Sequence, residues 1–223
     1  MPVPAASLRR RALVFALVGA LLVVTAVVLG VLLELRSNAP FALDAWWNNL
    51  LVDWASPTLA SFAFILDAIG GGWFGVYVVP LLVTGIFLLV RRPWSALFFL
   101  SASVISAGAV QLLKSVFGRP RPEEILIAAD YGSFPSGHTA NAATMAVAFA
   151  VLFPRIWVIV AGAVWTAFMA FSRTFAHAHW LSDTLGGALV GAGTALLVAA
   201  AFTVLLAQDQ SRFQARREAR STA

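Results

Sequence analysis

The residues best suited to chemistry lie in three short polar stretches in the second half of this chain. They are Lys114–Pro122 (KSVFGRPRP), Pro135–His138 (PSGH) and Ser172–Asp183 (SRTFAHAHWLSD). Together they supply cations, a serine beside a glycine, histidines and a carboxylate. These are the groups needed to hold a phosphate and to break its ester bond. The combination points to an enzyme rather than to a purely structural protein.

In the first stretch, Lys114 ends an apolar run and Arg121 follows seven residues later. Gly118 and Pro120 between them favour a turn, so we expect both cations just beyond a helix end. Lysine as a point charge and arginine as a planar fork are complementary ligands for phosphate oxygens. The alternative is that they are ordinary basic residues capping a membrane span.

The second stretch places Ser136, Gly137 and His138 where a loop becomes a helix. Helix N-termini present unpaired amides and a partial positive charge, and a glycine lets an anion approach those amides closely. This pattern predicts an anion site. Alternatively, Ser136 is only an N-cap and His138 only an interfacial residue.

In the third stretch, Ser172 and Arg173 are followed by His179 and Asp183. His179 and Asp183 are four positions apart, which places both on one helix face. A carboxylate that binds one imidazole nitrogen leaves the other available as a nucleophile, and attack on phosphorus would give a phosphohistidine. The simpler alternative is an interfacial histidine paired with an acid.

A metal site is a further alternative, because His177, His179 and Asp183 resemble a set of three zinc ligands. If Lys114, Arg121 and Arg173 converge on the same place, they would repel a divalent cation and attract phosphate. We therefore predict no metal and no cofactor, and assign His177 no role.

The composition places these residues in a membrane. The chain has 223 residues, of which 61% are hydrophobic and 11% charged. This leaves too little polar surface for a soluble globule. Runs of roughly 20 apolar residues are long enough to cross a bilayer as helices, and they lack the two-residue alternation of barrel strands. We predict an all-α polytopic membrane protein with six spans: Leu13–Leu33, Trp73–Val90, Trp94–Leu113, His138–Phe153, Ile156–Phe171 and Leu185–Ala207.

The net charge of +5 forms no single patch, so we do not expect nucleic-acid binding. If the six spans alternate, ten arginines fall on one side, which the positive-inside rule makes cytoplasmic. They are Arg9, Arg10, Arg11, Arg91, Arg92, Arg155, Arg212, Arg216, Arg217 and Arg220. We thus predict a plasma-membrane protein with both termini in the cytoplasm and its site on the outer face. A signal peptide in residues 1–35 is the alternative to a retained first span, but its apolar stretch is long for one.

Residues 36–72 are the one sizeable segment predicted not to span. From Phe41 to Trp54 apolar and polar positions recur at helical spacing, which predicts an amphipathic helix at the outer interface, with its tryptophans at headgroup level. A second short helix could start at Pro57 and end before Gly70–Gly72. We expect one domain over residues 1–208 and a basic cytoplasmic tail over residues 209–223.

The three stretches together resemble the three-part motif of the type 2 phosphatidic acid phosphatase (PAP2) superfamily. Lys114 with six residues before Arg121-Pro122, then Pro135–His138, then Ser172-Arg173 with five residues before His179 and three more before Asp183, match it without a gap or substitution. The motif covers only about 25 residues, while the six-span pattern extends the resemblance over most of the chain.

The resemblance implies a role for each matching residue. His179 would be the nucleophile, Asp183 its orienting carboxylate and His138 the general acid. The phosphate ligands would be Lys114, Arg121, Ser136, Gly137 and Arg173. It also implies metal-independent hydrolysis of a lipid phosphate, for which phosphatidic acid, phosphatidylglycerol phosphate and undecaprenyl or another polyprenyl diphosphate are the candidates. The remaining alternatives are a transporter that uses the same anion pocket without turnover and a purely structural membrane protein. The oligomeric state is not predicted.

Overall fold

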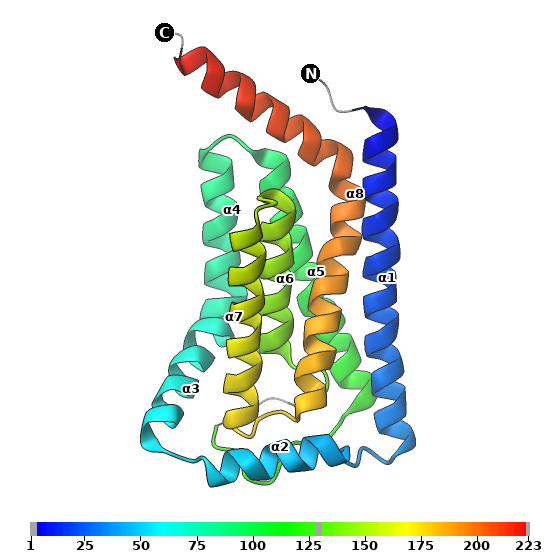
Figure 1. Ribbon diagram of the computed structural model, residues 1–223, viewed down its shortest axis with the longest axis vertical. Coiled ribbons are helices and arrows are strands. Elements are labelled where there is room, and N and C mark those ends of the chain that lie inside the picture. The colour runs from blue at the N-terminus through cyan, green and yellow to red at the C-terminus, as the bar shows by residue number, and fades with distance from the viewer. Residues whose placement is uncertain (1–3, 128–130, 222–223) are drawn as a thin grey trace.

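The computed structural model describes residues 4–127 and 131–221, and this part of the chain is helical, as predicted. Most of the helices stand roughly along one axis, and one lies across an end of the bundle (Figure 1). The helices described are α1 (Ala5–Leu35), α2 (Ala42–Asp53), α3 (Pro57–Gly70), the π-helical segment η1 (Phe74–Val78), α4 (Val79–Leu89), α5 (Pro93–Phe117), α6 (Gly137–Leu152), α7 (Ile156–Phe175) and α8 (Leu181–Ser221).

Among the described residues, five helical segments are long and apolar enough to cross a membrane. They are Ala5–Leu35, Pro57–Leu89, Pro93–Phe117, Ile156–Phe175 and Leu181–Arg216. The predicted fourth span corresponds to α6, an apolar helix of 16 residues. At about 1.5 Å per residue it is shorter than the roughly 30 Å hydrocarbon core. The prediction of a polytopic all-α membrane protein is confirmed, whereas only five of the six predicted spans meet the length expected of a span.

The second span begins earlier than predicted. We interpreted Gly70–Gly72 as a break before Trp73, but α3, η1 and α4 together form one bent apolar segment from Pro57 to Leu89. The bend falls at Gly72, whose φ is +54°. The side-chain amide of Asn141 stabilises it by donating to the carbonyls of Gly70 (3.2 Å) and Gly75 (2.9 Å). Glycine therefore bends this segment without ending it.

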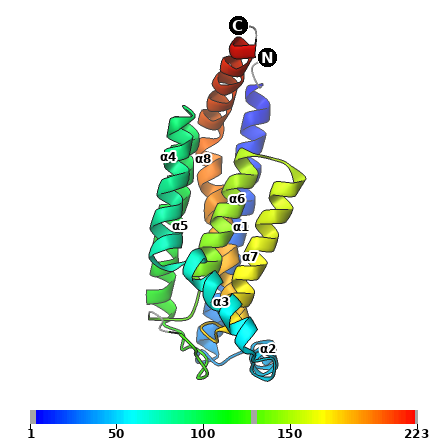
Figure 2. The same ribbon diagram turned by 90° about the vertical axis from the view of Figure 1, so that its left-hand side faces the viewer.

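Helices α5, α6 and α8 form the centre of the bundle, with α1 packed along α8 and α7 along α6 (Figures 1 and 2). The α6–α8 contact depends on Gly191, since a Cβ there would lie 2.1 Å from the carbonyl oxygen of Ala140. Small residues commonly allow membrane helices to approach this closely. The contact holds the start of α6 beside the start of α8, where two of the three polar stretches meet.

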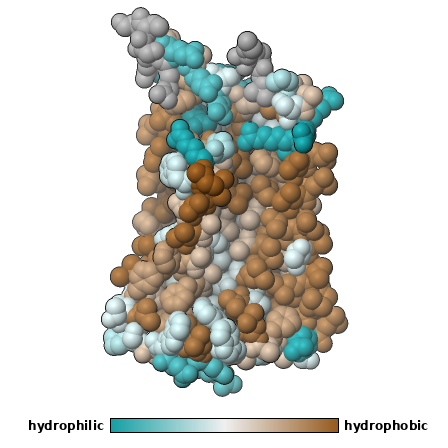
Figure 3. Space-filling model, viewed as in Figure 1, coloured by the Kyte–Doolittle hydropathy of each residue, from teal (hydrophilic) through white to brown (hydrophobic). Residues whose placement is uncertain are grey.

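Both ends of the chain lie at one end of the bundle, and α2 lies across the other (Figure 1). Polar side chains gather at both ends, and the face between them is mostly apolar (Figure 3). The connections α4–α5 and α6–α7 lie at the same end as the termini. The predicted grouping of basic residues on one side therefore agrees with the helix directions. Helix α8 continues past residue 209 to Ser221, and the buried Asp209 carboxylate accepts hydrogen bonds from Ser95.

Helix α2 is present where the amphipathic helix was predicted, but two of its polar residues, Asp44 and Asn48, point inward. Asp44 and Asn48 are buried, whereas Trp46 and Trp54 are 56% and 52% exposed. These two side chains face inward because they bind groups that follow α5 and groups between α7 and the start of α8, as described below. Helix α2 thus closes the end of the bundle with an inner face that combines the buried Asp44 and Asn48 with the buried apolar Leu51.

Candidate active site

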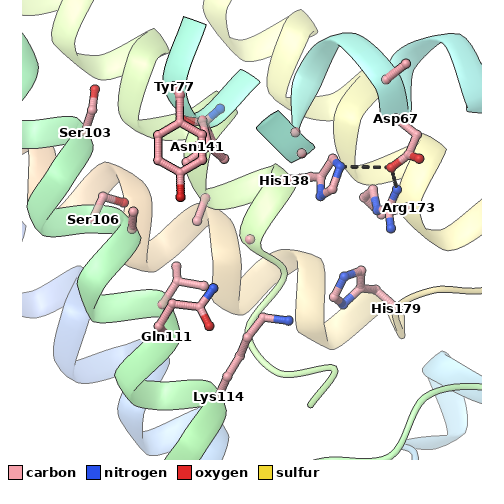
Figure 4. Close-up of a pocket in the computed structure, with 18 residues that line it drawn as sticks. Asp67, Tyr77, Ser103, Ser106, Gln111, Lys114, His138, Asn141, Arg173 and His179 are labelled. Atoms are coloured by element: carbon pink, nitrogen blue, oxygen red, sulfur yellow. Dashed lines mark hydrogen bonds and ion pairs between the residues drawn. The ribbon is translucent and has the colours of Figure 1, made fainter. Parts of the chain in front are cut away.

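A cavity of about 510 Å³ lies between α3, η1, α5 and α6. Among the described residues, its lining includes five of the eight predicted site residues: Lys114, Gly137, His138, Arg173 and His179. Figure 4 shows both imidazoles, the lysine and the arginine directed into the same space from different helices and loops. The fold therefore brings the three polar stretches together, as their joint use on one phosphate requires.

His179 is positioned by the loop that precedes α6. Its Nδ1 lies 2.7 Å from the backbone carbonyl oxygen of Ser133. A carbonyl can only accept, so Nδ1 carries the proton and donates it to this bond. The other nitrogen, Nε2, then holds a lone pair, and it lies 3.3 Å from Nη1 of Arg121. The unprotonated nitrogen of the predicted nucleophile is therefore turned toward a cation that can bind phosphate.

Burial and the surrounding charges keep this imidazole neutral. The side chain is 3% exposed. Its pKa lies well below the usual 6.5, first because burial disfavours the charged form and then because Arg173, Arg121 and Lys114 repel a proton. A neutral imidazole is the nucleophilic form, so the surroundings of His179 favour attack.

Asp183 lies behind His179 but is not its direct partner. Its Oδ2 is 3.8 Å from Nδ1 of His179, beyond hydrogen-bonding distance, and accepts instead from the backbone N–H of Trp180 at 2.8 Å. Its Oδ1 binds Nη1 of Arg119 at 2.5 Å. The geometry thus differs from a simple His–Asp pair. The Ser133 carbonyl orients the ring, and the Asp183 carboxylate fixes the turn that carries it.

Sequence analysis gave Arg119 no role, yet it is one of the most buried side chains in the described structure, 1% exposed. Besides Asp183, it binds Ser182 Oγ (2.8 Å) and Asp44 Oδ2 (3.1 Å). Asp44 also accepts from the backbone N–H and the hydroxyl of Ser182, at 2.8 and 2.7 Å. This buried network joins α2, the loop after α5 and the start of α8.

The two cations of the first stretch share one anchor. Lys114 Nζ donates to the carbonyl oxygen of Gly132 at 2.8 Å, and Arg121 Nη2 donates to the same oxygen at 3.0 Å. Gly118, with φ +50°, ends α5 and turns the chain back toward the cavity. Lys114 and Arg121 therefore converge although the chain between them leaves the helix.

The start of α6 has the predicted geometry of a helix N-terminus. Ser136 is the N-cap: its hydroxyl accepts from the backbone N–H of Thr139 (3.5 Å) and contacts the Thr139 hydroxyl (3.1 Å). It is fully buried, and its backbone N–H donates to the carbonyl of Asp183 at 2.9 Å. Gly137 lines the cavity. The N-cap interpretation of Ser136 is therefore confirmed, and its use as a phosphate ligand stays a prediction.

Sequence analysis missed Asp67 of α3. Its Oδ1 lies 2.9 Å from Nε2 of His138, and the same oxygen binds Nη1 of Arg173 (Figure 4). Asp67 is the only charged residue between Pro57 and Val90, and an isolated acid within a span is a typical mark of function. The criterion did not single out Asp67 in the sequence, because residues 36–72 were predicted not to span.

The alternative of a metal site gains nothing from the geometry. Among residues 4–127 and 131–221, no three His, Asp or Glu side chains are placed to bind one ion. His177 lies away from His179, with its Nδ1 2.7 Å from Oδ1 of Asn48 on α2. Its contact is with α2 and not with the cavity.

The structure is thus an all-helical membrane protein in which two buried cations and two histidines line one cavity. Residues 95–206 match the model of the PAP2 superfamily, which is half of the chain. This chain belongs to the PAP2 superfamily.

Two curated proteins are similar in sequence to part of this chain. Lipid A 1-phosphatase of Rhizobium johnstonii is 34% identical over 124 residues, 49% of this chain and 48% of that protein. Lipid A 1-phosphatase of Porphyromonas gingivalis is 38% identical over 89 residues, 39% of this chain and 19% of the relative. The chain thus spans half or less of the length of these curated relatives.

Two crystal structures are similar in fold. A transmembrane PAP2 type phosphatidylglycerolphosphate phosphatase from Bacillus subtilis has a TM-score of 0.70 at 22% identity, over 81% of this chain and 93% of that one. Aquifex aeolicus LpxE has a TM-score of 0.61 at 26% identity, over 71% and 95% of the two chains. The first likeness supports the fold alone.

Proposed function

We propose that this protein is a membrane phosphatase that removes phosphate from a lipid through a phosphohistidine. The observation that carries the proposal is the placement of His179: its unprotonated Nε2 lies beside Arg121, and His138 lines the same cavity. A nucleophile, a proton donor and cations around one space are the parts that phosphoryl transfer needs.

In the first step, Nε2 of His179 attacks phosphorus in line with the ester bond. The N–P bond forms as the P–O bond breaks, and His138 donates a proton to the departing oxygen. Lys114, Arg121 and Arg173 stabilise the charge on the equatorial phosphoryl oxygens, supported by the amides at the start of α6.

In the second step, water attacks the phosphohistidine. His138, now neutral, takes the proton from water, the N–P bond breaks, and inorganic phosphate leaves with His179 restored. Both steps balance without a metal ion, so we propose a metal-independent reaction.

Asp183 and Arg119 act in this scheme through the turn that carries His179. The carboxylate, 3.8 Å from Nδ1, also stabilises positive charge on the ring while the phosphohistidine forms. Arg119 and the backbone N–H of Trp180 hold the Asp183 carboxylate in this position during both steps.

The substrate is a lipid because the cavity lies within a helix bundle whose outer face is apolar at this depth (Figure 3). The curated relatives act on lipid A 1-phosphate by name. Phosphatidic acid, phosphatidylglycerol phosphate and a polyprenyl diphosphate are the further candidates. We propose that α6 serves as a sixth, central span, that both termini are cytoplasmic and that the cavity faces the extracytoplasmic side.

The test is phosphate release by the purified protein in EDTA, with His179→Ala as the inactive control. We expect wild-type turnover to be unaffected by EDTA and the variant to lose at least about 1,000-fold. Acid-labile, base-stable labelling by ³²P-substrate, trapped in His138→Ala, would identify the phosphohistidine. Activity that collapses in EDTA and returns with zinc would instead establish a metal site. Tight lipid-phosphate binding without turnover would establish the transporter alternative.

A further inference from the structure

A groove separate from the catalytic cavity lies between α6 and α7, near the end of the bundle that carries both termini. Its volume is about 570 Å³. The residues that line it belong to α6 and α7 and to the turn between them, among them Ala146, Phe149, Phe153, Arg155, Ala161 and Trp165. None of its described lining residues also lines the catalytic cavity. We call it the α6–α7 groove.

The α6–α7 groove exists because the bent segment from α3 to α4 covers only part of α7. One stripe of α7 runs through Val158, Gly162, Trp165 and Met169 at helical spacing. Toward the α2 end, α3 covers this stripe, since Trp165 and Met169 pack with Leu66. Beyond the bend, α4 packs against α5 instead and lies apart from α7 (Figure 2). The part of the stripe nearer to the termini is therefore left uncovered by α4.

The size of the α6–α7 groove suits an acyl chain better than a further helix. From Trp157 to Trp165 it follows α7 for about 12 Å, at about 1.5 Å per residue. A helix is about 10–12 Å across with its side chains, so this length of helix would occupy roughly 900–1,400 Å³. The 570 Å³ of the groove is smaller than that. A Cβ at Gly162 would lie 2.8 Å from the Cβ of Ala146, so the two walls already touch at the floor.

The lining is apolar except at the mouth, where Arg155 is the one charged residue among the described lining residues. Its side chain is exposed, and it has no ion-pair partner in residues 4–127 and 131–221. Arg92 lies over the ring of Phe153 at 5.6 Å, but its Nε is 3.9 Å from the Asp209 carboxylate. Trp157, beside Arg155, is 63% exposed. A cation and an indole at the mouth of an apolar groove complement a lipid phosphate at headgroup level.

We propose that the α6–α7 groove binds an anionic phospholipid that is not a substrate. Its phosphate lies on Arg155, and one acyl chain lies along Ala161 and Trp165. The lipid belongs to the leaflet at the end of the bundle that carries the termini, opposite the end that α2 covers.

The lipid would stabilise the two helices that carry groups of the candidate active site. Helix α6 begins at Gly137, next to His138, and Arg173 lies in the last turn of α7. A chain that fills the groove at the other ends of these helices supports their packing, because a ligand bound only to the folded state stabilises that state. The inference does not depend on the proposed phosphatase function.

The first experiment maps the lipid by photo-crosslinking. Phosphatidylglycerol and phosphatidylcholine, each with a diazirine near the middle of one acyl chain, are mixed separately with the purified protein in detergent micelles. We expect cross-links of phosphatidylglycerol to residues 145–165 to exceed those of phosphatidylcholine about fivefold, because one arginine near an anionic lipid is worth about that factor. Arg155→Gln should remove this difference. Arg212→Gln, an exposed arginine at the same end, is the matched control and should keep it.

Equal labelling by the two lipids in the wild-type protein would overturn the proposal. A difference that persists in Arg155→Gln would overturn it as well, because the lipid phosphate would then lie elsewhere.

The second experiment measures thermal unfolding in the same micelles. Phosphatidylglycerol at about 100 times its Kd should raise the midpoint of the wild-type protein by roughly 5–10 °C relative to phosphatidylcholine. Ala161→Phe places a ring in the groove and should lose this shift. Val160→Phe is the matched control, since Val160 is 53% exposed and does not line the groove.

A shift retained in Ala161→Phe would contradict the proposed site. A wild-type dimer in these micelles that Ala161→Phe separates into monomers would assign the groove to a second copy of the chain and would also overturn the proposal. Loss of the shift in both Arg155→Gln and Ala161→Phe, with both controls unchanged, would support it.

Discussion

The Nδ1 atom of His179 lies 2.7 Å from the carbonyl oxygen of Ser133, and this contact decides which ring nitrogen faces the cavity. Because the partner is a backbone carbonyl, no side-chain substitution can remove it without moving the loop before α6. The orientation of the nucleophile therefore depends on the packing of two loops far apart in sequence.

The lowered pKa of His179 gives a pH prediction. The neutral ring attacks, so kcat/KM falls as the pH drops through that pKa, which burial and then the neighbouring cations hold below 6.5. Arg121→Gln removes one of these cations, so the pKa rises and the acidic limb moves to higher pH. It should also lower kcat/KM by about 100- to 1,000-fold. Comparing variant with wild type on one substrate cancels the titration of the substrate itself. Arg212→Gln, an exposed position, is the control, and an unmoved limb in Arg121→Gln would argue against His179 as the titrating group.

Asp67 occupies the groups that a substrate phosphate needs. Its carboxylate binds Arg173 and lies 2.9 Å from His138 Nε2, so an incoming phosphate must displace it. Asp67→Asn should therefore bind vanadate more tightly, because the competing negative charge is gone. The same change should lower kcat by about tenfold or more, because His138 loses the anion that favours its proton-donating form. Weaker vanadate binding together with unchanged kcat would show that Asp67 is only structural.

The Arg119 network predicts a stability effect. Arg119→Met leaves the buried carboxylates of Asp44 and Asp183 without their shared cation. Loss of one partner of a buried ion pair typically costs about 3–5 kcal/mol in the free energy of unfolding. Thermal unfolding in detergent should show a clear drop in midpoint. Arg212→Met, on the exposed part of α8, should stay within about 0.5 kcal/mol. Equal midpoints for the two variants would mean that the network contributes little.

A side chain at position 71 should displace His138, the proposed proton donor. A Cβ at this position would lie 1.9 Å from Nε2 of His138, so the imidazole would have to move. A displacement of about 1 Å at a reacting group can cost roughly 100-fold in rate, and we expect a loss of that order in kcat for Gly71→Ala. Gly85→Ala is the matched control, since no atom lies within 4 Å of its Cβ position. Wild-type kcat in Gly71→Ala would show that His138 needs no fixed position.

For helix α2, the sequence pattern predicted the helix but not which of its faces points inward. The spacing of apolar and polar residues predicted the helix itself, because amphipathic periodicity is local. It did not tell which face turns inward, since Asp44 and Asn48 are buried by partners far away in sequence. The prediction of a helix break at Gly70–Gly72 was wrong for a related reason. Glycine permits a bend as well as a break, and the Asn141 amide, 66 residues beyond Gly75, stabilises the bend.

The helical membrane class and the residue types of the site could be predicted from the sequence, because hydropathy and motif spacing are properties of the chain taken in order. Three relationships follow from the packing of the helices alone: Ser133 orients His179, Asp67 contacts His138 and Arg173, and Arg119 joins α2 to Asp183. Each of these contacts is made between residues at least 46 positions apart, and which distant groups meet depends on helix packing in three dimensions rather than on any local pattern.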